Sequence, residues 1–270
     1  MSLGKRIRLN RIFGHPSGRL CSVAVDHLMN YGNDWGSAPP AGLLHIVPTI
    51  DAIMAAQPDA MTMHKGIATS LWTPYAGKAP LILQCSLIRT DDSIFEHVVG
   101  VEEAVRLGAD AIAVAAFVRG NSEAKHMRAV AEYVREAARF ELPVICHIYP
   151  RVFEGGVRIS FAPDDIAWAV RCAVEMGVDV VKSPYCGEPA AYRQIANDCP
   201  VPLVAAGGPQ TRSLEEALGM MLAVVENGGM GATIGRNIWG ITQITEAVHA
   251  FKAVIHDKMA PADAIRAAGL

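Results

Sequence analysis

The stretch Pro163–Tyr185 reads PDDIAWAVRCAVEMGVDVVKSPY and contains one complete helix–turn–strand unit. Its first part, Pro163–Met176, has the apolar spacing of an amphipathic helix. Gly177 can cap that helix, and Val178–Val181 is a short apolar run typical of a buried parallel strand. Lys182 follows at the strand end, where burial of its charge would be costly and therefore points to a specific role.

Similar units recur along the chain and together define the architecture. Most even-numbered candidate strands follow a glycine that can cap a helix, whereas the third, fifth and seventh follow a proline, which stops a helix. The eight candidate strands are Leu20–Val25, Ala60–Met63, Leu81–Cys85, Ala111–Val114, Val144–Ile148, Val178–Val181, Leu203–Ala206 and Ala232–Ile234. This repeat predicts an α/β fold, a single-domain (β/α)8 TIM barrel over residues 1–270, with an N-terminal extension 1–19 and a C-terminal helix 261–270. An open doubly wound sheet fits less well, because no Gly-x-Gly-x-x-Gly turn follows the first strand.

Two further helices and two loops complete the expected organisation. Glu123–Arg139 and Leu214–Asn227 are predicted helices. Met29–Ala41 and Gly66–Lys78 depart from the repeat and are expected to be loops. Both follow the C-terminal ends of strands, and this is the face where barrel enzymes place their sites.

Bulk properties exclude several classes of partner. A net charge of -3 with scattered basic residues gives no reason to expect nucleic acid. No apolar run of membrane-spanning length and no signal-peptide pattern is present, so we expect a cytoplasmic protein without membrane association. The six cysteines lack a Cys-x-x-Cys pair, which fits a reducing compartment; a cysteine nucleophile stays open as a minor alternative.

Barrel topology predicts that residues just past the strand ends converge on one mouth. This set is rich in acid–base and anion-binding groups. Its members are Asp26, His27, His64, Lys65, Ser86, His147, Tyr149, Arg151, Lys182, Tyr185, Gly207, Gly208, Gly235 and Arg236.

Lys182 is the expected nucleophile of this mouth. Burial and nearby positive charge, from Lys65 or Arg236, would lower its pKa and expose a free amine for attack on a carbonyl. Tyr149 is a candidate proton shuttle, with a packed aromatic as the alternative. Asp26 is expected to orient a substrate hydroxyl or take its proton, or to pair with a lysine.

Two glycine turns predict a phosphate site. Gly207-Gly208-Pro209 lets the backbone approach a ligand, and Gly235-Arg236-Asn237 adds an arginine fork at the start of the segment after the eighth strand. Barrels often hold phosphate in the loops after strands seven and eight. Metal binding by His27, His64 and His147 is the weaker alternative, because these histidines lack a tight ligand spacing.

These motifs resemble the archaeal-type class I fructose-bisphosphate aldolases. The matching segments are Asp26-His27, His64-Lys65-Gly66, Tyr149-Pro150-Arg151, Val181-Lys182, Gly207-Gly208-Pro209, Gly235-Arg236-Asn237 and the opening Gly4–Leu9 with Arg11-Ile12-Phe13. The resemblance extends to the thiolase that processes phosphorylated autoinducer-2. It implies a (β/α)8 barrel, an imine-forming Lys182, an acid–base Tyr149, a helper Asp26, and a homo-oligomer, often a decamer. Gly207, Gly208, Gly235 and Arg236 would hold phosphate, and His27 and Lys65 are grouped with these substrate-binding residues.

Departures from the family pattern lie around the substrate. Leu28 and Val152 stand where the family usually has glycine, and Ser183-Pro184-Tyr185 replaces Thr-x-Tyr. We therefore expect a class I aldolase for a phosphorylated ketose, without metal or organic cofactor. Alternatives are thiolase-type acyl transfer to coenzyme A from a phosphorylated diketone, and a phosphosugar-binding barrel without catalysis.

Overall fold

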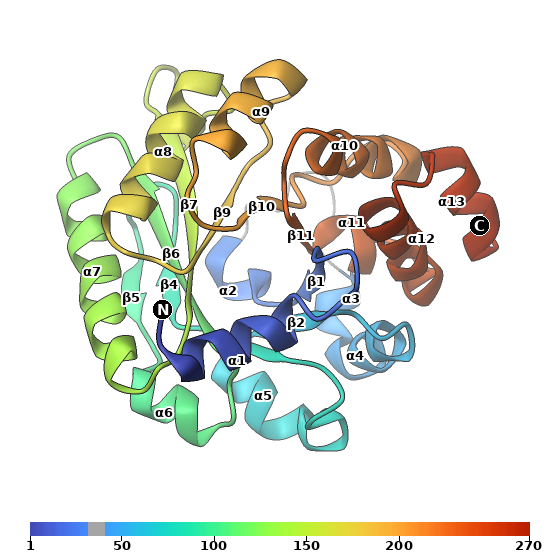
Figure 1. Cartoon of the computed structure of the whole chain (residues 1–270), viewed down its shortest axis with the longest axis horizontal. Helices are drawn as coiled ribbons and strands as arrows, with labels where there is room; N and C mark the ends of the chain where they lie inside the picture. Colours follow the sequence, from blue (N-terminus) through green and yellow to red (C-terminus); the bar gives the residue numbers. More distant parts are fainter. Residues whose placement is uncertain (32–40) are drawn as a thin grey trace.

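The computed structural model describes residues 1–31 and 41–270, and its centre is a closed parallel barrel (Figure 1). The barrel strands are β1 (Leu20–Ala24), β2 (Ala60–Met63), β3 (Leu81–Gln84), β6 (Ala111–Val118), β7 (Val144–Val152), β9 (Val180–Ser183), β10 (Leu203–Ala206) and β11 (Gly231–Ile234). They pair in the order β6-β3-β2-β1-β11-β10-β9-β7, and β6 pairs with β7 to close the ring. The predicted (β/α)8 barrel is therefore confirmed.

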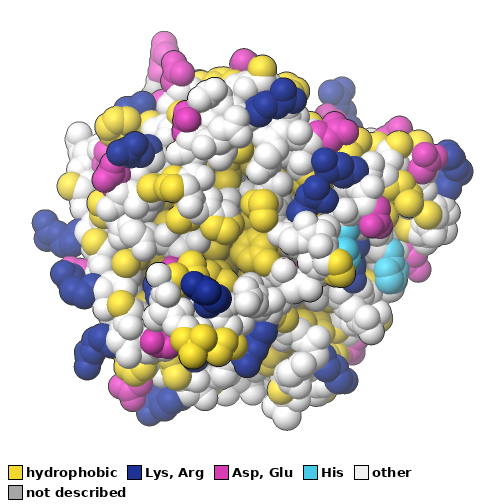
Figure 2. All heavy atoms as spheres, in the orientation of Figure 1, with side chains coloured by type: hydrophobic (Ala, Val, Ile, Leu, Met, Phe, Trp, Pro, Cys, Tyr) yellow, Lys and Arg dark blue, Asp and Glu magenta, His cyan; other side chains and the backbone are white. Residues whose placement is uncertain are grey.

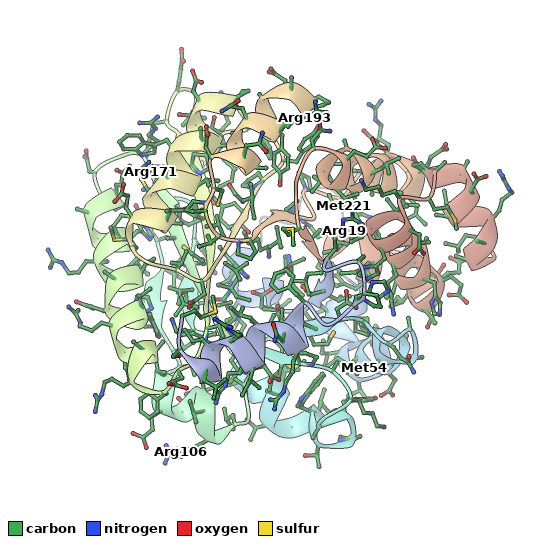
Figure 3. The ribbon with its side chains drawn as sticks, viewed as in Figure 1. Arg19, Met54, Arg106, Arg171, Arg193 and Met221 are labelled. Carbon is green, nitrogen blue, oxygen red and sulfur yellow. The ribbon has the colours of Figure 1, made fainter. Side chains whose placement is uncertain are left out.

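Helices surround the barrel because each strand alternates its side chains between two apolar layers. In β9, Val181 belongs to the layer under the helices and Val180 to the layer inside the barrel. The surrounding helices are α4 (Ile46–Ala55), α5 (Lys65–Leu71), α6 (Val101–Arg106), α7 (Glu123–Arg139), α8 (Pro163–Glu175), α9 (Pro189–Asn197), α10 (Leu214–Glu226), α12 (Ile244–Asp257) and α13 (Pro261–Ala268). Figure 3 shows Arg106 and Arg171 on the outer sides of α6 and α8. Across the described part of the chain, no helix has both the length and the apolarity to cross a bilayer.

The N-terminal extension closes the barrel at the end opposite the strand C-termini. Helix α1 (Leu3–Ile12) places Leu9 and Ile12 in one cluster with barrel-interior residues such as Leu20 and Val204. Figure 1 looks at this end, with α1 in front of the strands, and Figure 2 shows hydrophobic side chains gathered at its centre. Because this end is filled, a ligand enters from the other one.

Two strands are longer than predicted and carry extra structure at the open end. β6 and β7 continue their pairing to Val118 and Pro150, beyond the predicted ends at Val114 and Ile148. After β7 the chain turns back into β8 (Arg158–Ile159), which pairs with Arg151 and Val152. After β3, β4 (Ser86–Ile88) and β5 (Phe95–His97) form an antiparallel pair. Both additions build up the same side of the mouth.

The two expected loops are in part helical. Gly66–Lys78 was expected to be a loop, but most of it lies in α5 and in a 3-10 helix, η1 (Thr73–Tyr75). This expectation was wrong because α5 begins directly after β2, without a connecting loop. Of Met29–Ala41, residues 32–40 lie outside the described residues, and the flanking parts belong to α2 (His27–Tyr31) and α3 (Ala41–Leu44).

Candidate active site

A cavity of about 610 Å3 opens at the C-terminal ends of the barrel strands. Its wall contains Asp26, His27, His147, Tyr149 and Lys182, with the glycine turns after β10 and β11. Residues that are up to about two hundred positions apart in sequence therefore face one space. The barrel brings them together because all its strands are parallel and end on the same side.

Lys182 lies inside the barrel, at the base of this cavity. Alternation along β9 sends its side chain to the interior, and only 4% of the residue is exposed. Burial lowers the pKa of Lys182, the charge of Asp26 opposes this effect and that of Arg236 adds to it, and the resulting pKa is about 8. Within residues 1–31 and 41–270, no carboxylate lies within ion-pair distance of its ammonium group. A buried, unpaired amine with such a pKa is suited to nucleophilic attack.

Asp26 lies at the end of β1 and is held by two neighbours. Gln84 Nε2 donates a 2.9 Å hydrogen bond to Asp26 Oδ2, and His27 Nδ1 lies 3.2 Å from Asp26 Oδ1. Burial by itself would raise the pKa of Asp26, but the hydrogen bond from His27 and the charge of Lys182 hold it well below its ordinary range. Asp26 is therefore an ionised carboxylate at neutral pH.

Gln84 was missed by the sequence reasoning. It ends β3 as a buried amide, with its Oε1 accepting a 3.1 Å bond from the Ser86 backbone. Its side chain thus fixes Asp26, at the end of β1, from β3, which is two strands away in the barrel. The available signal was a polar residue within the apolar run Leu81–Cys85, because buried polar groups need partners.

Two histidines beside the lysine are uncharged. Burial lowers the pKa of His27, with the nearby charges of Lys182 and Arg236 adding to this effect against that of Asp26. Burial and Lys182 likewise lower the pKa of His147 well below its ordinary value. His147 is the cross-strand partner of Lys182 between β7 and β9, and its Nδ1 lies 3.4 Å from Gln84 Nε2. Neutral imidazoles leave Asp26 as the negative charge that acts on the lysine.

Tyr149 lies farther toward the mouth on the same strand. It is two residues after His147, so its side chain points to the same side of β7, roughly 6–7 Å nearer the opening. The ring packs at a tilt against Phe117, with 6.1 Å between centroids, and lines the cavity. This position would let the phenol reach a group bound above Lys182.

The two glycine turns adjoin one another on the opposite side of the cavity. Gly208 has a φ of +73°, and a Cβ on Gly207 would approach the Cα of Ile234 to 2.9 Å. Asn237 ties the turns together: its Nδ2 donates to the carbonyls of Gly207 (2.9 Å) and Pro209 (3.0 Å). The sequence motif contained Asn237, but this tying role was not foreseen.

Arg236 and Gly235 complete this side. Arg236 begins α11 (Arg236–Trp239) and lines the cavity, half-buried. Gly235 is required by His27, because a Cβ there would clash with the imidazole ring. The turns therefore combine close backbone approach with a guanidinium, which suits an anionic ligand.

Several predicted mouth residues lie elsewhere. Lys65 does not line the cavity; its ammonium pairs with Glu103 at 3.0 Å and is half-exposed. The sequence grouped Lys65 with the substrate-binding residues; in the structure α5 begins at this residue, and its side chain reaches Glu103 of α6. The candidate metal triad does not form either, since His64 is not in the cavity wall.

Arg151 is also absent from the cavity wall. Its guanidinium is buried and donates to the carbonyls of Thr90 and Arg119, to Asp92 and to Ser122. It thereby joins the segments that follow β3 and β6 to β7. Ser86 and Tyr185 lie outside the wall as well; the Ser86 hydroxyl accepts a bond from the Ala115 backbone, and Tyr185 packs on Tyr192.

Comparisons with known proteins place the chain among aldolases. The family described as DeoC/LacD family aldolase matches residues 20–240. The class 1 fructose-bisphosphate aldolase of Thermoproteus tenax is 32% identical over 85% of this chain and 86% of its own length. The 3-hydroxy-5-phosphonooxypentane-2,4-dione thiolase of Yersinia enterocolitica is 30% identical over 94% and 82% of the two chains. A solved Schiff-base-forming fructose-1,6-bisphosphate aldolase superposes with a TM-score of 0.78 at 27% identity, covering 93% of this chain and 99% of the other.

Proposed function

The chain belongs to the DeoC/LacD aldolase family, and from this premise we propose that it forms or cleaves a carbon–carbon bond in a phosphorylated ketose through an imine on Lys182. The observation that carries this proposal is the buried amine of Lys182 at the base of the cavity, which has no ion-pair partner among the described residues. Fructose 1,6-bisphosphate or a related sugar phosphate is the substrate class.

The first step is attack of the Lys182 amine on the ketone carbon. With a pKa of about 8, roughly a tenth of this lysine is neutral at pH 7, against fewer than one in a thousand for an ordinary lysine. Loss of water gives a protonated imine. In cleavage, the substrate hydroxyl gives up its proton and its carbon departs as the aldehyde, while the electron pair of the broken carbon–carbon bond moves to this imine and forms an enamine. Protonation of the enamine and hydrolysis then release the ketone and restore the amine.

Asp26 and Tyr149 supply proton transfer and orientation. The ionised Asp26 carboxylate, fixed by Gln84, is placed to accept a hydrogen bond or a proton from a substrate hydroxyl near Lys182. The Tyr149 hydroxyl, nearer the mouth, would donate to or accept from the oxygen of the aldehyde half. His27 would contact the substrate from the α2 side, with its ring set by Asp26.

The phosphate of the ketone half would lie at the turns. Gly207, Gly208 and Gly235 offer close backbone approach, and Arg236 offers two N–H donors. Asn237 holds the turns in place before the ligand arrives, so little ordering cost remains on binding. No step requires a metal or an organic cofactor.

Thiolase-type acyl transfer is the second candidate, because the Yersinia enterocolitica relative is matched over nearly the whole chain. In that reaction a phosphorylated diketone would pass an acyl group to coenzyme A. Turnover that depends on coenzyme A would favour this alternative; turnover without it supports the aldolase.

A cytoplasmic location and a homo-oligomer, with a decamer as one size, remain part of the proposal. The free cysteines support the location, because they suit a reducing compartment. The exposed apolar residues Leu3 and Ile7 on α1 support the oligomer.

Borohydride trapping tests the proposal. The protein is incubated with dihydroxyacetone phosphate and borohydride, digested, and its peptides are weighed by mass spectrometry. We expect a reduced adduct on the peptide that holds Lys182, its loss in Lys182→Met, and its retention in the matched control Lys65→Met, whose lysine lies outside the cavity. An adduct that is retained in Lys182→Met would overturn the proposal.

A further inference from the structure

The cavity has two chemically different ends. Asp26, Lys182 and the glycine turns make one end polar and charged. The other end is formed by the strand additions after β3 and β7 and by the long strand β6. Its wall consists of Ile88, Ala115 and Phe117, a buried cluster against which Tyr149 and Ile159 pack.

This apolar wall continues to the opening. Val157 and Phe161 line the cavity although they are 39% and 43% exposed. Both flank β8, the short strand that folds back on β7. Covering exposed apolar side chains at a cavity mouth with an apolar ligand removes apolar surface from water, which favours binding.

Two polar groups near this wall already make hydrogen bonds within the protein. Asn30 Oδ1 accepts from the Ile88 backbone (3.3 Å), and its Nδ2 donates to the Asp26 carbonyl (3.4 Å). The Thr90 carbonyl is occupied by Arg151. Among the described residues at this end, the Thr90 and Tyr149 hydroxyls are the main further side-chain partners. A ligand with several hydroxyl groups would therefore lose more hydrogen bonds to water than it regains here, which is costly.

Among the described residues that line this end, Arg158 is the charged one, and it lies on the outer rim. Its side chain is exposed, on β8, so solvent and salt weaken its attraction for an anion. The buried wall lies between this rim and Lys182. Groups close to the reacting carbon therefore meet Ile88, Phe117 and Ile159 before they reach Arg158.

We infer that the apolar end receives the aldehyde half of the reaction and selects an aldehyde with an apolar carbon chain. Within the proposed class, the substrate is then a ketose phosphate with an apolar tail and not fructose 1,6-bisphosphate itself. This inference rests on the proposed function. With the phosphate at the turns and the ketone carbon on Lys182, the new bond must extend toward Tyr149 and the apolar wall. The enamine carbon forms a bond to the aldehyde carbon, the aldehyde oxygen gains a proton, and water hydrolyses the imine; no other reactant is consumed.

Aldol synthesis with competing aldehydes tests the selection. Dihydroxyacetone phosphate is held constant, and kcat/KM is measured for 3-phenylpropanal, succinate semialdehyde and glyceraldehyde 3-phosphate. We expect 3-phenylpropanal to exceed each charged aldehyde by about tenfold or more, since burying a few apolar carbons in a matched pocket has an effect of that size. A preference for glyceraldehyde 3-phosphate, or for succinate semialdehyde, would overturn the inference.

A matched pair of variants separates the wall from general damage. Phe161→Ser removes an aromatic ring that lines the cavity, and Phe153→Ser removes a ring of similar exposure (49%) that does not. The ratio of kcat/KM for 3-phenylpropanal to that for glyceraldehyde 3-phosphate should fall about tenfold in Phe161→Ser and stay within twofold in Phe153→Ser. An equal change in both variants would contradict the role of the wall. The Lys182 adduct is measured in parallel: its absence refutes the proposed function, whereas its presence without aldehyde selection refutes this inference alone.

Discussion

Gln84 donates a hydrogen bond of 2.9 Å to the carboxylate of Asp26 across the interior of the barrel. Gln84 takes no direct part in the proposed chemistry, but this contact fixes the position of the Asp26 carboxylate in the cavity. Asp26 in turn acts on the pKa of Lys182. The pKa of the lysine is therefore linked to side chains at the ends of two other strands.

The first prediction concerns this contact. Gln84→Leu removes the donor at similar volume, and a hydrogen bond to a charged group contributes about 1.5–3 kcal/mol. We expect the pKa of Asp26 to rise and kcat/KM to fall about tenfold or more, with the acidic limb of the pH–rate profile shifted to higher pH. A profile that superposes on that of the unmodified protein would show that Gln84 does not support Asp26.

The second prediction concerns the pH dependence of imine formation. Only the neutral amine attacks, so the rate of borohydride-trapped adduct formation should rise with pH and level off above about 8, the pKa of Lys182. Arg236 lowers this pKa and Asp26 raises it. The inflection should therefore move up in Arg236→Ala and down in Asp26→Asn. Shifts in the same direction for both variants would contradict the assigned charge effects.

The third prediction concerns stability. The pKa of Lys182 falls from its ordinary value of 10.5 to about 8 on folding, so the unfolded chain binds the extra proton between these values. At pH 7 the buried ammonium of Lys182 therefore lowers the free energy of unfolding by roughly 3 kcal/mol. This destabilisation declines as pH rises through the window between the two pKa values. Lys182→Met should be more stable than the unmodified protein in urea at pH 7.

The size of that difference provides the check. Between pH 7 and pH 9.5 it should shrink by about 2 kcal/mol, because the folded protein has then lost the buried charge. Lys65→Met serves as the control, since Lys65 is half-exposed and paired with Glu103. A stability difference for Lys182→Met that is independent of pH would contradict the lowered pKa.

The fourth prediction separates covalent attachment from proton transfer. Tyr149→Phe keeps the ring that packs on Phe117 and removes only the hydroxyl. We expect the borohydride adduct on Lys182 to persist while turnover slows by roughly a hundredfold or more. Single-turnover kinetics distinguish the two steps. Loss of the adduct together with turnover would instead place Tyr149 in imine formation.

The fifth prediction addresses the phosphate. Arg236→Ala removes a charge-assisted pair of donors and should cost about 2–4 kcal/mol in kcat/KM for a phosphorylated ketose. The loss should be much smaller for the same ketose without phosphate. Equal losses for both substrates would indicate that Arg236 supports the structure of the turn and does not bind phosphate.

Much of the fold was predictable because local sequence patterns determine where its strands and helices begin and end. Short apolar runs, helix-capping glycines and strand-opening prolines marked all eight barrel strands to within a few residues of their observed starts. The extensions of β6 and β7 were not predictable, since they depend on pairing with each other and on β8. The position of Lys182 followed from the sequence, as alternation along one strand sets which side its side chain faces.

Which of the strand-end residues meet depends on how the barrel closes. Lys65 and Lys182 carry the same side chain at the ends of two barrel strands, yet Lys65 pairs with Glu103 outside the cavity and Lys182 is buried within it. Gln84 and Asn237 gained their roles from contacts across 58 and 30 residues. The periodicity, the strand ends and the residue types at those ends follow from the sequence, because they depend on neighbours along the chain. Charge partners, pKa values and the apolar wall depend on neighbours in space, and only closure of the barrel establishes those.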